Sequence, residues 1–239
     1  AAVKALSNEK SSIDTKVCAL VNLLEDGKPI KMSKRAGNFV TLSEIIEAVG
    51  KDVIRFIMLT RRNDQTLDFD FKKVTEKSKE NPVFYVQYAH ARCNSIFKSA
   101  KVLEEDVLPE NLNLLTNENE IALIKFITLW PRVLELAARN HEPHRICYYL
   151  IELASNFHSL WSKGKDDNNI KFVLEGNHVL TNSRLSLVKA VALTLRKGLT
   201  LLLPCSHRYR SILWIQIHFL RVRIFQRPCQ ILILGSCGW

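Results

Sequence analysis

The sequence predicts a mainly α-helical protein that begins with a short α/β portion. From about residue 81 onward, apolar residues recur at three- and four-residue intervals between capping signals, which is typical of amphipathic helices. Near the start, in contrast, Val17, Ala19, Val21 and Leu23 form an alternating apolar run, the pattern of a strand. The 239 residues are 47% apolar, so one or two domains with a sizeable core are expected.

The first portion is predicted element by element. Residues 1–10 have the composition of a helix end, and residues 13–24 are expected to form a buried strand. A turn over residues 25–28 and a basic loop follow. Thr41 and Glu44 match a capping box, so a helix is expected to begin there and to end at Gly50. Asp52 is placed to cap a second short helix.

Residues 67–71 alternate like a short extended segment that carries two carboxylates, Asp68 and Asp70. Two carboxylates can serve as general acid and base. Neither a nucleophile nor metal-ligand spacing accompanies them, so a capping and turn role is favoured. Asp70 is expected to cap a helix over residues 71–79.

The helical portion begins at Asn81 and Pro82, a favoured N-cap followed by a proline in the first turn. This helix is expected to reach about Leu103, before a polar loop over residues 104–119. Three further helices are predicted over residues 120–140, kinked or split by Pro131, over residues 143–161, ended by Gly164, and over residues 181–199.

Lys31, Met32, Ser33, Lys34 and Arg35 place three basic side chains on a loop that follows a strand. Such lysines can neutralise charge developing on a phosphate, while the serine hydroxyl and the loop N–H groups donate hydrogen bonds. A solvated basic loop is the alternative interpretation of the charge pattern alone.

Tyr85, Tyr88 and Arg92 lie on one stripe of their predicted helix. Two rings and a cation suit stacking on unpaired bases, although the spacing alone favours rings packed in a core. His144 and Arg145 are candidates either for phosphate contact or for capping. His141 and His144 lack a third metal ligand.

The basic loop resembles the Lys-Met-Ser-Lys-Ser signature of class I aminoacyl-tRNA synthetases, which binds ATP phosphates. The segments that follow it resemble arginyl-tRNA synthetases in particular. The resemblance extends from about Val3 to about Leu202 and is carried by residues 36–42 (AGNFVTL), 52–56 (DVIRF), 67–70 (LDFD) and 81–92 (NPVFYVQYAHAR).

The resemblance implies the end of a Rossmann-type catalytic domain followed by an all-α anticodon-binding helical bundle. The implied divisions are residues 1–40 for the catalytic domain end, 41–80 for connecting helices, 81–202 for the bundle and 203–239 for an atypical tail. Lys31 to Arg35 would bind ATP, with Lys34 catalytic. The implied tRNA-binding residues are Tyr85, Gln87, Tyr88, Arg92, His144, Arg145 and Arg184.

The implied function is ATP-dependent attachment of arginine to its tRNA. ATP, with magnesium, and arginine would be the other partners of the complete enzyme. The second class I signature, His-x-Gly-His, does not occur in this sequence, so the chain alone is expected to be inactive. A separately encoded N-terminal half could complement it. The alternative is a catalytically inactive tRNA-binding fragment or the product of a decayed gene.

Composition indicates the kind of partner and the cellular location. A net charge of +10 favours acidic partners, with nucleic acid first and an anionic membrane surface second. Cys18, Cys93 and Cys147 are expected to be reduced core thiols, and no cysteine spacing indicates zinc. With no signal peptide and no apolar run of about 18 residues, a cytoplasmic protein is expected.

Residues 203–239, which contain five arginines and no lysine or acidic residue, are interpreted as frame-shifted or, alternatively, as a membrane-surface segment.

Overall fold

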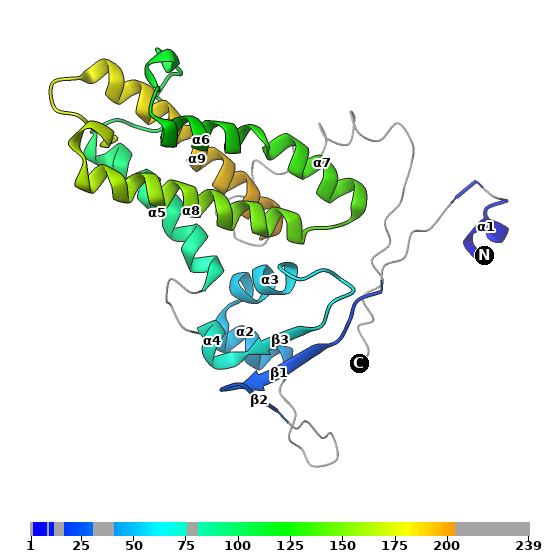
Figure 1. Cartoon of the computed structure of the whole chain (residues 1–239). Coiled ribbons are helices and arrows are strands. Elements are labelled where there is room, and N and C mark those ends of the chain that lie inside the picture. Colours follow the sequence, from blue (N-terminus) through cyan, green and yellow to red (C-terminus); the bar gives the residue numbers. More distant parts are fainter. Residues whose placement is uncertain (1, 9, 12–16, 31–40, 76–80, 204–239) are drawn as a thin grey trace.

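The computed structural model describes residues 2–8, 10–11, 17–30, 41–75 and 81–203. Helices α5 to α9 form a bundle, and a small sheet with α2 and α4 lies apart from it, with α3 between the two (Figure 1). The basic loop from Lys31 to Arg35 and the tail beyond Leu203 lie outside the described residues, so their predicted roles stay predictions.

The described elements follow one another in this order: α1 (Ala2–Leu6), β1 (Val21–Glu25), β2 (Lys28–Pro29), α2 (Leu42–Val49), α3 (Lys51–Leu59), β3 (Leu67–Asp70), α4 (Phe71–Thr75), α5 (Pro82–Ser99), a 3-10 turn (Leu112–Leu114), α6 (Glu118–Thr128), α7 (Trp130–Asn140), α8 (His144–Asp166), a second 3-10 turn (Asn168–Ile170) and α9 (His178–Leu202). The prediction of a mainly α-helical chain with a short α/β start is confirmed.

The sheet has the strand order β2-β1-β3. β1 pairs antiparallel with β2 through a two-residue turn, in which Asp26 and Gly27 both have positive φ, as a tight hairpin requires. β1 pairs in parallel with β3, so that Leu24 lies opposite Asp70. The end of β3 therefore lies beside the hairpin turn.

Asp70, at the end of β3, connects the hairpin turn with α4 through hydrogen bonds. Its carboxylate accepts hydrogen bonds from the N–H of Gly27 (2.8 Å) and from the N–H of Lys72 (3.1 Å), which lies in the first turn of α4. Asp68 instead accepts a cross-strand bond from the Asn22 side chain (2.8 Å). The capping and turn role expected for the pair is confirmed for Asp70, whereas Asp68 bonds across the two strands.

Replacing Asp70 by asparagine should reduce the loss of unfolding free energy that occurs as the pH falls below about 4. Burial on its own would raise the pKa of the Asp70 carboxyl, but the backbone N–H groups of Gly27, Lys72, Lys73 and Asp26 together lower it. A lowered pKa in the folded state means that the stabilisation is complete above about pH 4 and is lost as the pH falls further. Urea unfolding of both proteins between about pH 2 and 7 measures this. Parallel pH profiles would contradict the assignment.

α2 and α3 follow each other with Gly50 as the junction. Thr41 and Glu44 form the predicted capping box, and Gly50, at φ 88°, ends α2. α3 begins at the next residue, with Gly50 also in its cap position, so the prediction that Asp52 caps α3 is wrong. Because α3 starts without an intervening loop, Asp52 falls inside its first turn.

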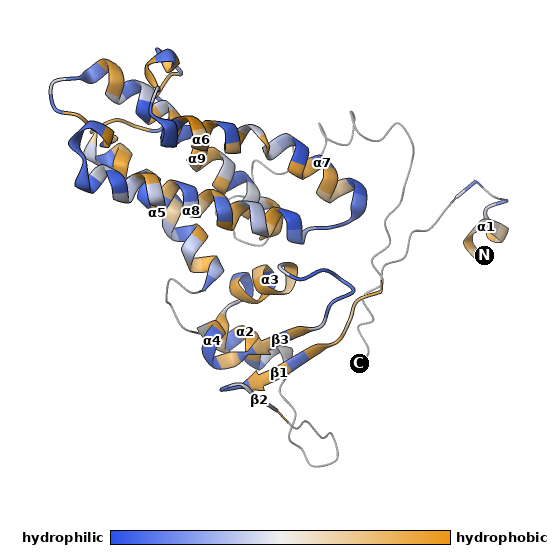
Figure 2. Cartoon of the chain, viewed as in Figure 1, coloured by the Kyte–Doolittle hydropathy of each residue, from blue (hydrophilic) through white to orange (hydrophobic). Residues whose placement is uncertain are grey.

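The bundle is built around α8 and α9, with α5 packed on both and α6 and α7 packed on α8. Hydrophobic and hydrophilic residues alternate along these helices, as in amphipathic helices (Figure 2). The predicted helix over residues 120–140 is split as expected: α6 ends at Thr128, and Pro131 lies in the first turn of α7. Fully buried side chains of the core include Leu123, Leu150, Leu153, Phe157, Leu185 and Leu195.

Several boundaries and burial states differ from the predictions. α8 does not end at Gly164 but continues to Asp166. Gly164 instead allows the backbone of Ile170 to approach α8 closely, since a Cβ there would lie 3.2 Å from the carbonyl oxygen of Ile170. α9 begins three residues earlier than predicted, since Asn177 caps it through the Leu180 N–H (3.1 Å). Cys18 is exposed rather than a core thiol, as it lies in the segment that precedes β1.

One face of α9 holds the irregular loop that follows α5. Ser183 donates to the carbonyl of Asn111 (3.0 Å) and Ser186 to that of Leu108 (2.8 Å). Lys189 donates to the carbonyl of Val107 (2.7 Å). Arg196 makes a two-bond pair with Glu104 at 3.0 and 2.9 Å, which completes the attachment. None of the helices in the described ranges is long and apolar enough to cross a membrane.

Candidate nucleic-acid interface

The first helix of the bundle, α5, places three predicted site residues on one side. The Asn81 side chain accepts from the Val83 N–H (3.2 Å) and donates to the carbonyl of Val74 (2.9 Å), so it both caps α5 and fixes it to α4. Tyr85, Tyr88 and Arg92 follow at intervals of three and four residues. Tyr85 is partly buried, whereas Tyr88 is 51% exposed.

Arg92 is enclosed by aromatic rings. Its guanidinium carbon lies 3.6 Å from the Trp161 ring centroid and 4.5 Å from that of Tyr88. Nη2 also donates a hydrogen bond to the Tyr88 hydroxyl (3.0 Å). A planar guanidinium stacks well on aromatic faces, and these contacts fix the orientation of the exposed tyrosine.

His158, on α8, lies behind these side chains. Arg92 Nη1 is 2.7 Å from His158 Nδ1, and because arginine can only donate, Nδ1 is the acceptor. In neutral His158 the proton is therefore on Nε2, which faces the carbonyl of Tyr85 at 3.4 Å. The imidazole also packs against both tyrosines, with ring centroids 4.7 Å from Tyr85 and 5.6 Å from Tyr88.

We call Tyr85, Tyr88, Arg92, His158 and Trp161 the aromatic–arginine cluster. Lys165 adds a positive charge, with its ammonium group 3.9 Å from the Trp161 ring centroid. The cluster thus combines one exposed ring, held by partly buried neighbours and the buried His158, with the Arg92 cation, and Lys165 lies next to it. This arrangement suits stacking of an unpaired base next to a phosphate.

His158, Trp161 and Lys165 were missed by the sequence analysis. They follow one another at intervals of three and four residues on α8, so their common face was visible in the spacing. What the spacing could not show is that this face of α8 packs against the Tyr88 face of α5. Gln87, also on α5, is partly buried.

His144 and Arg145 lie at the other end of α8, fourteen residues before His158 and therefore roughly 20 Å away along the helix axis. Arg145 pairs with Glu142, and this hydrogen bond lowers the pKa of the Glu142 carboxyl. Burial lowers the pKa of the His144 imidazole, and the charge of Arg145 lowers it further against the opposing effect of Glu142. His144 and Arg145 are therefore not part of the aromatic–arginine cluster.

Arg184 is turned into the bundle. It is only 4% exposed, and its Nε donates to the carboxylate of Glu120 (2.6 Å), which is 1% exposed. Nη1 donates to the carbonyl of Lys171 (2.7 Å). The predicted tRNA contact of Arg184 remains a prediction, and the described structure gives this side chain partners on α6 and in the loop before α9.

The helical bundle with its exposed aromatic face is similar to a known class of helical domain. Residues 86–203 match the family model described as the DALR anticodon binding domain. Over 84% of its length the chain is similar to the C-terminal part of arginyl-tRNA synthetases.

Individual relatives support this conclusion. The arginine–tRNA ligases of Azorhizobium caulinodans and Methylobacterium nodulans are 50% and 52% identical to the chain over 210 and 209 residues. The chain spans only 36% and 35% of their lengths. A solved arginyl-tRNA synthetase structure from Campylobacter jejuni shares 31% identity at a TM-score of 0.65, covering 76% of this chain and 38% of that one. The Thermus thermophilus arginyl-tRNA synthetase, at 24% identity and a TM-score of 0.51, supports the fold alone.

Proposed function

We propose that this chain is the C-terminal portion of an arginine–tRNA ligase, which attaches arginine to its tRNA with ATP as the energy source. In this proposal residues 81–202 bind the anticodon end of the tRNA. The observation that carries it is the exposed Tyr88 ring, held in place by Arg92, inside a domain of the anticodon-binding family. We propose the cytoplasm, where translation uses such an enzyme, as its location.

The aromatic–arginine cluster would act as a stacking platform. A base from a single-stranded loop would lie on the outer face of Tyr88, while Arg92 and Lys165 lower the cost of bringing a phosphate close. His158 would keep the Tyr88 and Arg92 side chains in one arrangement before the RNA arrives, which reduces the entropy lost on binding. Gln87, His144 and Arg145 are proposed as additional contacts, and Arg184 as support inside the bundle.

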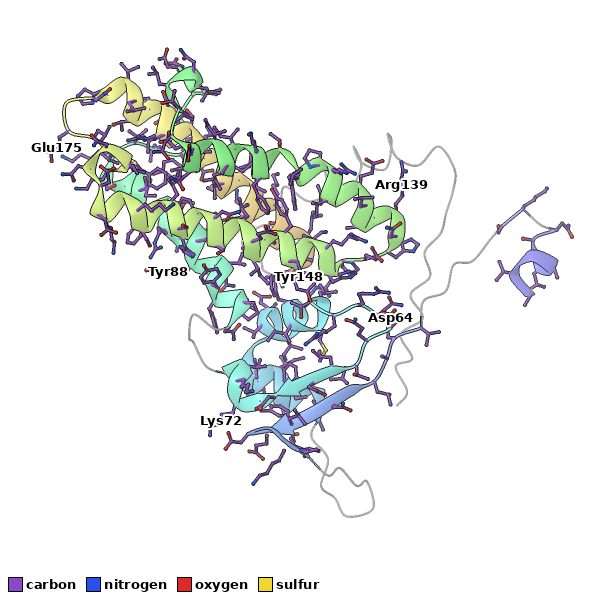
Figure 3. The ribbon with its side chains drawn as sticks, in the orientation of Figure 1. Asp64, Lys72, Tyr88, Arg139, Tyr148 and Glu175 are labelled. Atoms are coloured by element: carbon purple, nitrogen blue, oxygen red, sulfur yellow. The ribbon has the colours of Figure 1, made fainter. Side chains whose placement is uncertain are left out.

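Replacing Tyr88 by alanine should weaken binding of the arginine tRNA by roughly 5- to 150-fold, since loss of one base stack costs about 1–3 kcal/mol. Tyr148→Ala is the matched control, because Tyr148 is 52% exposed on α8, and both labelled tyrosines are visible in Figure 3. The control should stay within about twofold. Binding is measured by fluorescence anisotropy at several salt concentrations. Equal affinities of the wild type and Tyr88→Ala would contradict the proposal.

The salt series adds an independent check. A footprint of about three neutralised phosphates would weaken binding roughly 20-fold between about 50 and 200 mM salt. The stacking contribution of Tyr88 should change little over that range, because stacking involves no counterion release. The ratio of the wild-type and Tyr88→Ala affinities should therefore stay nearly constant while both affinities fall.

By resemblance we propose that Lys31, Met32, Ser33, Lys34 and Arg35 contact the ATP phosphates in the complete enzyme, with Lys34 stabilising charge in the transition state. Within the described residues no three His, Cys, Asp or Glu side chains converge as a metal site requires. We therefore assign no magnesium ligand to that part of the chain.

The chain alone should show no arginine-dependent exchange between ATP and pyrophosphate, because its sequence lacks the His-x-Gly-His half of the activation site. The assay must contain tRNA, and the complete relative from Azorhizobium caulinodans serves as the positive control. Exchange above background by this polypeptide would show that activation needs less of the family's machinery than the proposal assumes.

A further inference from the structure

α3 connects the sheet to the bundle. It packs on α2 on one side, and on α5, α8 and α9 on the other (Figure 1). Val53, Ile54 and Phe56 are buried in these contacts, whereas Arg55 emerges at the edge of the helix. From this position Arg55 reaches the C-terminal end of α9, which is far away in the sequence.

The Nε of Arg55 donates a hydrogen bond to the carbonyl of Leu202, the last residue of α9. The last four carbonyls of a helix have no partner within the helix, and the negative end of the helix dipole attracts a cation. Leu202 and Leu203 are themselves buried, whereas Arg55 is exposed, so the bond lies at the edge of the core. A charge-assisted bond is therefore well placed to satisfy this carbonyl.

We infer that Arg55 is a positioning residue, which fixes the bundle in one orientation relative to the unit formed by the sheet, α2 and α4. α9 packs along both α5 and α8, and these two helices carry the aromatic–arginine cluster. Holding the end of α9 therefore also holds the cluster. Units of one chain otherwise move relative to each other unless their interface is large and apolar.

The functional meaning of this contact rests on the proposed function. One tRNA would have to reach from the bundle to the catalytic portion, so the angle between the two units sets how well both ends of the tRNA are held. Arg55 would then affect the geometry of the complex while leaving the contacts of the anticodon end unchanged. The inference about orientation can be tested without any RNA.

The structure offers a label site on each side of the contact. Cys18 is exposed, and its segment is anchored because the N–H of Ala19 donates to the carbonyl of Asn63 (2.6 Å). Ser155 is exposed on α8 and can be replaced by cysteine. Burial raises the pKa of the Cys147 thiol to about 12 and raises that of Cys93 as well, so neither should react at neutral pH. The remaining cysteines, at 205, 229 and 237, are replaced by serine.

The experiment measures the distance distribution between spin labels at Cys18 and Ser155→Cys. The wild-type background should give one narrow distribution, and Arg55→Ala should broaden it about twofold or more, as expected for units released from a fixed interface. Arg55→Lys, which keeps the charge and hydrogen-bond donors but loses the planar guanidinium, should give an intermediate width. Arg139→Ala is the control, since Arg139 pairs with Glu135 one turn away on α7, and it should leave the distribution unchanged.

Two further measurements separate the alternatives. If Arg55 merely stops the end of α9 from fraying, Arg55→Ala lowers the melting temperature but leaves the distribution narrow, which overturns the inference. Arg55→Lys provides the same test if the alanine variant does not fold. Affinity for an isolated anticodon stem-loop should stay within about twofold in Arg55→Ala, because the cluster itself is intact. Absent stem-loop binding in the wild type would refute the proposed function instead, without affecting the distance result.

Discussion

Replacing Glu120 by alanine should lower the free energy of unfolding by about 3–5 kcal/mol, because it leaves the Arg184 guanidinium buried without its charge partner. Both side chains of this pair are almost inaccessible to solvent, and the Nε to carboxylate distance is 2.6 Å. Glu120 also completes the capping box of α6, in which its carboxylate accepts from the Asn117 N–H (3.4 Å). The substitution therefore removes two functions of one carboxylate.

Two comparisons make this prediction specific. Glu135→Ala removes the partner of Arg139 in an exposed pair on α7, and it should cost no more than about 0.5 kcal/mol. The double replacement Glu120→Leu with Arg184→Met removes both charges, so it should recover most of the loss. Urea unfolding followed by circular dichroism gives all of these values. A loss below about 1 kcal/mol for Glu120→Ala would mean that water reaches the Arg184 guanidinium after all.

The second large effect concerns Gly198 on α9 and Leu150 on α8. A Cβ at Gly198 would lie 2.5 Å from Leu150 Cδ2, and Leu150 is fully buried. Gly198→Ala should therefore destabilise the bundle by about 1–2 kcal/mol through overpacking, despite the better helix propensity of alanine. Leu150→Ala should cost about 2–5 kcal/mol, because it opens a cavity in the core.

The double variant decides whether these two residues are directly coupled. Once Leu150 is shortened, the new methyl at position 198 has room, so Gly198→Ala should change sign and stabilise by up to about 1 kcal/mol. Leu193→Ala, on an exposed part of α9, is the control and should be additive with either change. Additive changes in unfolding free energy for Gly198→Ala and Leu150→Ala would show that α8 and α9 move apart to accommodate the new methyl group. Urea unfolding of the single and double variants measures the coupling.

Local signals explain which parts of the fold were predictable. The Thr41 capping box, the Asn81–Pro82 helix start and the split at Pro131 depend on side chains within a few residues of each other, and all three are confirmed. α9 begins before Thr181, the predicted opening residue, because its N-cap is Asn177. Thr181 instead accepts a bond from the Leu174 N–H (3.0 Å) in the preceding loop.

Contacts between distant segments were not predictable from the residues. Tyr148 belongs to the predicted helix over residues 143–161, but the spacing does not show that its ring lies on the solvent side of α8. Arg92 was identified as a cation near the tyrosines, yet its partners Trp161 and His158 come from a helix more than sixty residues further along the chain. The spacing identifies a face of each helix, while only the packing shows which two faces meet.

The attachment of the loop over residues 104–111 to α9 limits how this region can vary in length. Going along α9 from Ser183 to Arg196, the loop partners run backwards from Asn111 to Glu104, so the helix and the loop are matched position by position. Surface loops generally tolerate insertions, because nothing fixes their register. Here a single inserted residue would displace several carbonyls from their donors at once. Apart from Glu104, whose carboxylate pairs with Arg196, and the buried Val107, the loop is attached through its carbonyls, so it cannot change its length without losing these bonds to α9.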